Sequence, residues 1–139
     1  MVKPILGDLI VVSKVLYHVC KALIEAKEDF LEIAGDINAF CRGLEIVERR
    51  FQSRSETRFD AKGVKDLNDE IRRAKEMMDT FRKKLEPYHA ALSKRPPSEK
   101  PPKPERVWGR CRWITMGREV KRARERINAY RASIGFMAE

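Results

Sequence analysis

Apolar residues recur along the chain at alternating spacings of three and four, the spacing that places side chains on one face of an α-helix. Four such runs occur, over residues 9–23, 30–51, 64–85 and 113–137. The sequence has no alternating apolar and polar segments flanked by Asn-Gly or Asp-Gly turns, the pattern that indicates β-hairpins. It therefore predicts an all-α fold.

The breaks between these runs set the ends of the expected helices. Helices are predicted over about residues 6–25, 28–52, 61–92 and 113–137. Pro87 lies inside the third helix, and a kink or break is expected there because proline has no amide hydrogen to donate. Four helices with one apolar face each bury those faces by closing around a common core. We therefore expect one domain over residues 1–139, an antiparallel four-helix bundle with coiled-coil-like packing.

The segment before the last helix is rich in proline. Residues 93–105 read SKRPPSEKPPKPE and contain five prolines. Because proline removes an amide donor and holds the chain extended, we expect a flexible, solvated linker here.

The apolar repeats of the last three helices supply the expected core. Side chains at these repeat positions should meet in the interior, because burial of apolar surface is the main force that drives folding. The candidate core residues are Phe30, Ile33, Ile37, Phe40, Leu44, Leu67, Ile71, Phe81, Trp113, Val120, Ile127 and Ile134.

The first helix has apolar residues around much of its circumference, and this allows two interpretations. A helix that is apolar on all sides is usually buried, either in the centre of a bundle or against a further domain. Alternatively, the helix leaves the bundle and inserts into a membrane or self-associates. The candidate membrane or effector face consists of Leu9, Val12, Leu16 and Val19.

The net charge of +9 is unevenly distributed. Residues 1–60 hold 9 basic and 10 acidic side chains, whereas residues 61–139 hold 21 and 11. Lys94 to Arg131 alone contains 13 basic and 4 acidic residues. The candidate basic surface comprises Arg110, Arg112, Arg118, Lys121, Arg122, Arg124 and Arg126. Such a surface attracts an anionic membrane or an acidic protein partner.

Nucleic-acid binding is a third interpretation of the same basic segment. Arginines interleave with Trp108 and Trp113, a pattern that can stack bases. However, Trp113 begins the apolar repeat of the last helix, and charges opposite an apolar stripe are typical of a solvated helix face. The pattern therefore favours an anionic surface or an acidic protein over nucleic acid.

The sequence offers no recognisable catalytic, cofactor or metal site. It lacks a glycine-rich phosphate loop, HExxH, GxSxG and a calcium loop. Its three cysteines show no Cys-x-x-Cys spacing, and neither His18 nor His89 has a partner at ligand spacing. The longest uncharged stretches have seven residues, too few to span a bilayer, and Asp8 interrupts the N-terminal apolar run. We expect a non-enzymatic cytoplasmic protein without a secretory signal.

Both ends of the sequence resemble a known family. Residues 7–40 place Gly-Asp before an apolar helix with a Ser-Lys pair, followed by an acidic connection and a second heptad helix. Residues 106–137 contain Trp108, an Arg-Trp pair and a late Ser-Ile step. These features resemble the HeLo-like N-terminal domains of fungal STAND or NLR-like, ankyrin-repeat and heterokaryon-incompatibility proteins. The proline-rich insertion and the basic final segment depart from the typical member.

The resemblance implies a helical bundle attached to a sensor, whose homo-oligomerisation triggers a cell-death or immune-type response. It also implies that the first helix enters membranes, with recruitment to the plasma membrane on activation. A helical scaffold or dimerisation module without membrane activity is the alternative.

Overall fold

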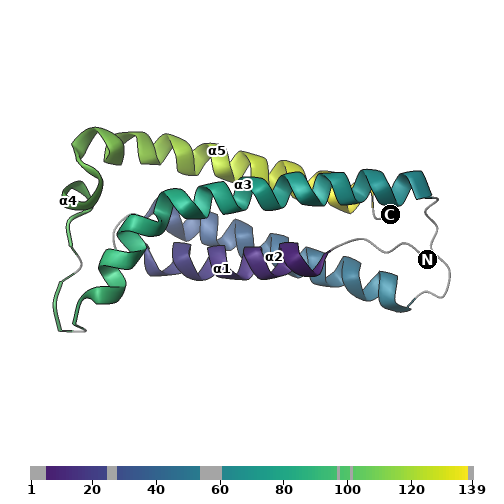
Figure 1. Ribbon diagram of the computed structural model, residues 1–139, viewed down its shortest axis with the longest axis horizontal. Coiled ribbons are helices and arrows are strands. Elements are labelled where there is room, and N and C mark those ends of the chain that lie inside the picture. Colours follow the sequence, from purple (N-terminus) through teal and green to yellow (C-terminus); the bar gives the residue numbers. More distant parts are fainter. Residues whose placement is uncertain (1–5, 25–27, 54–60, 97, 101, 138–139) are drawn as a thin grey trace.

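The computed structural model describes residues 6–24, 28–53, 61–96, 98–100 and 102–137, and every regular element in these residues is a helix. The helices are α1 (Gly7–Ala22), α2 (Asp29–Ser53), α3 (Ala61–Lys94), α4 (Pro104–Trp108) and α5 (Arg110–Met137). The predicted all-α class is confirmed. The described residues form five helices in place of the expected four, because the short α4 precedes α5 (Figure 1).

The four long helices lie side by side along the length of the molecule (Figure 1). α1 packs against α2 and α3, and α5 packs against the same two helices. Within the described residues, α1 makes no contact with α5, and α2 makes none with α3. The helices therefore enclose the core as a ring in which α1 and α5 lie diagonally opposite each other.

The core contains nearly every residue that the apolar repeats predict. Eleven of the twelve candidates are buried, and the side chain of Trp113 lies outside the described residues. α1 adds Leu9 and Leu16, and Leu23 follows directly after its end; all three are fully buried. One polar side chain lies among them: Ser13 Oγ donates a hydrogen bond to the carbonyl of Leu9 (2.8 Å), which satisfies the buried hydroxyl.

α3 continues past Pro87, so of the two expected outcomes, a kink or a break, the break does not occur. The helix continues to Lys94, and its last turns bend away from the axis of the rest (Figure 1). Bending is the usual response of a helix to an internal proline, which cannot donate to the preceding turn. The turn after Pro87 carries the fully buried Tyr88, so packing holds the helix together beyond the proline.

The proline-rich segment is exposed over most of its described residues, in line with the solvation that its composition predicts, and its C-terminal part is attached to the end of α3. Tyr88 Oη donates a hydrogen bond to the carbonyl of Pro102 (2.9 Å). The ring of Trp108, which is 7% exposed, lies 5.1 Å from that of Tyr88. Gly109, at φ 78°, separates α4 from α5 in the left-handed conformation that suits glycine at a helix end.

Candidate interaction surface

The candidate effector face of α1 points into the core. Leu9 and Leu16 are fully buried, Val19 is 4% exposed and Val12 is half-buried. In this conformation α1 is a core helix, as the first interpretation of its sequence proposes. Its exposed large apolar side chains are Val11 and Val15, which belong to the apolar circumference of the helix but lie outside the candidate effector face.

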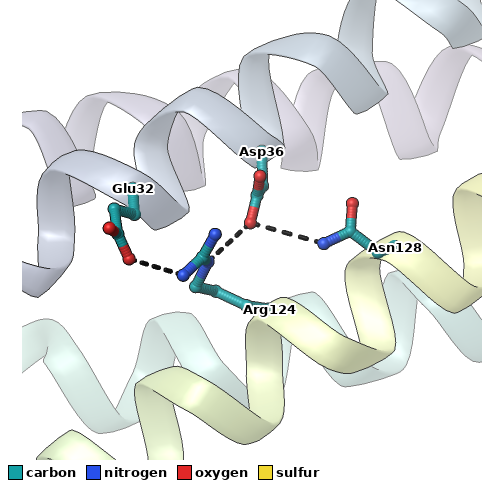
Figure 2. A network of polar contacts seen from close by, with 4 residues as sticks. All are labelled: Glu32, Asp36, Arg124 and Asn128. Carbon is teal, nitrogen blue, oxygen red and sulfur yellow. Dashed lines mark hydrogen bonds and ion pairs between the residues drawn. The ribbon is translucent and has the colours of Figure 1, made fainter.

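Arg124 joins two helices, and its assignment to the open basic surface is corrected. Its guanidinium donates from Nε to Asp36 Oδ2 (2.7 Å) and from Nη1 to Glu32 Oε2 (2.5 Å). Asn128 Nδ2 donates to the same Asp36 oxygen at 3.4 Å (Figure 2). The hydrogen bond to Asp36 and the neighbouring carboxylates raise the pKa of Arg124, so the guanidinium stays charged and is paired with carboxylates of α2.

The other described cations on α5 keep their charges uncompensated. These cations are exposed, and none of them makes an ion pair or side-chain hydrogen bond with another described residue; they are Arg118, Lys121, Arg122, Arg126 and Arg131. Arg118, Arg122 and Arg126 follow one another at intervals of four, with Cβ atoms roughly 5–6 Å apart on a helix. We call these three residues the arginine ladder. The side chains of Arg110 and Arg112 lie outside the described residues.

A groove of about 480 Å³ runs between α3 and α5 beside this ladder. Its apolar lining consists of Met77, Phe81, Ala123 and Tyr130. Its polar lining consists of Arg73, Glu76, Thr80, Lys84, Glu119, Arg122 and Arg126. Lys84 Nζ forms an ion pair with Glu119 Oε1 (3.3 Å) across the groove. Arg122 and Arg126 of the ladder also line the groove, and neither makes an ion pair with a described residue. Ala123 offers only a methyl group, which leaves space where a larger residue would pack.

The basic segment that the sequence treats as one surface therefore divides into two. The ladder and its groove lie on the side of the molecule formed by α3 and α5. The cations between Lys94 and Arg106 surround a second cavity next to α4, at one end of the molecule (Figure 1). Met77 and Thr80, which line the groove, carry no charge or repeat signal that marks them in the sequence.

The described cysteines are free and buried, which makes them poor nucleophiles. Burial raises the pKa of the Cys20 thiol to about 12. Burial, and then the charge of Glu45, also raise the pKa of Cys41. Among the described residues, no His, Cys, Asp or Glu side chains are grouped to hold a metal ion, and no helix is long and apolar enough to cross a membrane.

Comparison with protein-family models, with curated proteins and with solved structures finds no match for this chain.

Proposed function

We propose that this chain is a non-enzymatic signalling domain that binds an acidic protein partner through the arginine ladder and the groove between α3 and α5. We class its fold as an antiparallel four-helix bundle with coiled-coil-like packing, supported by the closed ring of contacts among the four long helices. The partner segment is an amphipathic helix with apolar residues on one side and carboxylates on the other.

The uncompensated arginine ladder is the observation that carries this proposal. Like charges spaced four apart on a helix repel one another and destabilise it by about 0.2–0.5 kcal/mol per pair. Arg124 forms ion pairs with carboxylates of α2. Arg118, Arg122 and Arg126 have no such partner among the described residues. An external anion relieves this repulsion.

The groove favours a protein segment over a flat lipid surface. It combines cations with a recessed apolar lining, and a helix that docks in a groove uses both kinds of contact at once. α1, the candidate membrane helix, lies diagonally opposite α5 in the ring. In this conformation a flat bilayer that lies along the side of the bundle cannot contact both helices, so their sides do not form a single membrane-binding face.

The test is binding of a fluorescent helical peptide with leucines on one face and glutamates on the other. The triple variant Arg118→Gln, Arg122→Gln, Arg126→Gln should bind between about threefold and about 150-fold more weakly, because exposed ion pairs contribute about 0.2–1 kcal/mol each. The matched control replaces three exposed cations elsewhere: Arg42→Gln, Lys62→Gln, Lys65→Gln. Equal affinities of the two variants for the peptide contradict the proposal. Light scattering tests another copy of this chain as the occupant of the groove. If the wild-type protein is an oligomer and the ladder variant is a monomer, the partner is that second copy.

A membrane-active effector domain of the HeLo-like kind is the second candidate. Its supporting observation is the distribution of apolar residues on α1, which has a buried stripe and also exposes Val11 (61%) and Val15 (43%). This function requires α1 to leave the core and to insert its apolar surface into lipid. Leakage of vesicles at physiological salt separates the candidates, because a protein-binding domain leaves vesicles intact.

A further inference from the structure

The turn between α3 and α4 gathers cations around one cavity. The cavity has a volume of about 590 Å³ and lies next to the end of α3. Its charged lining residues are Lys94, Arg95, Lys100, Lys103, Arg106 and Glu99. Five cations thus face a single carboxylate. We propose that this cavity binds an anion that carries several phosphate groups.

Most of these charges are available to a ligand. Lys94, Lys100, Lys103 and Arg106 are exposed, and none pairs with a carboxylate in the part of the chain that the structure describes. Neighbouring positive charges raise the local potential and concentrate anions. The cavity is too large for one monovalent anion to contact all its cations, whereas phosphates on a common frame reach several of them together. Clusters of four to eight Lys and Arg residues are a recognised feature of sites for polyphosphorylated headgroups.

Three hydrogen bonds support the described backbone of this turn. Tyr88 Oη fixes the carbonyl of Pro102, and the Arg95 guanidinium donates to the carbonyl of Glu99. The Glu99 amide in turn donates to the carbonyl of Pro96 (3.0 Å). Prolines restrict the backbone further, so less backbone entropy is lost on binding than in a flexible tail of the same charge. This distinguishes the turn from a flexible basic tail.

Two sources supply such an anion, a soluble oligophosphate or the headgroup of a phosphorylated lipid. Tripolyphosphate, measured by isothermal titration calorimetry, is the soluble probe. Phosphatidylcholine vesicles that contain phosphatidylinositol bisphosphate are the lipid probe, and vesicles with phosphatidylserine at equal surface charge are their control. All measurements use the full chain at about 150 mM salt, where exposed charges are largely screened beyond about 8 Å.

The double variant Lys100→Gln, Lys103→Gln tests the site, because both side chains are exposed and make no contact that supports the fold. Each lysine near an anionic surface contributes about fivefold to affinity, so we expect the variant to bind at least one phosphate probe about thirtyfold more weakly. Arg118→Gln, Arg122→Gln is the control of equal net charge and should bind the phosphate probes like the wild type. Unchanged melting temperatures show that both variants are folded.

Three outcomes overturn the proposal. One is an equal loss of affinity for the phosphate probes in both variants, because binding would then depend on the net charge of the protein and not on the position of the cations. Another is absence of binding to tripolyphosphate together with equal binding to the two anionic vesicles. The third is tighter binding of a single-stranded oligonucleotide than of either phosphate probe, which makes the turn part of a nucleic-acid surface. The arginine ladder does not line this cavity, so the proposal does not depend on it and the ladder variant can serve as the control.

Discussion

Neutralising Asp36 is expected to weaken the contact between α2 and α5 far more than neutralising Glu32, although both carboxylates pair with Arg124. The Asp36 side chain is 22% exposed and accepts from Arg124 Nε at 2.7 Å, whereas that of Glu32 is 65% exposed. A hydrogen bond to a charged group contributes about 1.5–3 kcal/mol when shielded, and an exposed ion pair about 0.2–1 kcal/mol. We therefore expect a coupling free energy of about 1.5 kcal/mol for Asp36 with Arg124, and below about 0.5 kcal/mol for Glu32 with Arg124.

Double-mutant cycles with Asp36→Asn, Glu32→Gln and Arg124→Gln measure these two couplings. Urea unfolding followed by circular dichroism gives the free energy of unfolding of each variant, and Asp36→Asn alone should lower the melting temperature by about 5 °C. Raising the salt concentration should reduce the coupling of the exposed Glu32 more than that of Asp36. Equal couplings for the two carboxylates, or none for Asp36, would refute the reasoning that burial decides their contributions.

Three further predictions concern other parts of the protein. The free energy of unfolding should decrease as the pH rises from about 9 toward 12, because the pKa of Cys20 is raised in the folded protein and the unfolded thiol ionises first; the Cys20→Ala variant should lack this component when unfolding is measured across that range. Tyr88→Phe removes the hydrogen bond to Pro102 and should destabilise the protein by about 1 kcal/mol, with faster amide hydrogen exchange and proteolysis between α3 and α4. Leu9→Glu should unfold the protein, because it places a charge in the core, whereas Val11→Glu should keep the melting temperature nearly unchanged; abolished vesicle leakage in folded Val11→Glu would support a membrane role, and unchanged leakage would contradict a role of that surface.

The helices and their buried faces follow from the sequence because one physical signal determines both. A run of apolar residues at helical spacing is also the face that the helix buries, and Ile37, Leu67 and Ile127 illustrate this with no exposed surface at all. The helix ends were less certain. α3 passes through Pro87 because burial of Tyr88 holds the following turn, and this tertiary contact outweighs the local preference of proline.

The anchoring of the proline-rich segment was not predicted because its two anchors lie far apart in the sequence. Composition alone indicates a solvated arm, and Trp108, which lies among arginines, was interpreted as a residue available for stacking with bases. Tyr88 did continue the apolar repeat of its helix, and this was the one signal that the end of α3 has something to bury. The ring that Tyr88 contacts, that of Trp108 at 5.1 Å, can be identified only from the folded structure.

Charge pairing depends on which helices become neighbours, and this explains why the basic surface was only partly predicted. Glu32 and Asp36 lie four apart on α2, as do Arg124 and Asn128 on α5, so each pair lies on one helix face. These spacings mark two polar stripes but do not indicate that the stripes meet. Because α2 and α5 are neighbours, Arg124 forms an ion pair that joins the two helices. The arginine ladder has no such partner among the described residues.

The fold therefore gives the positive charge between Lys94 and Arg131 three different roles. Arg124 stabilises the contact between α2 and α5, the ladder faces a groove with an apolar lining, and the lysines near α4 surround a cavity at one end. A measurement that responds to net charge alone cannot separate these roles, because removing any two cations changes the net charge equally. Variants matched in charge and different in position can separate them, since the ladder and the turn belong to different elements, and neither needs α1 to leave the core.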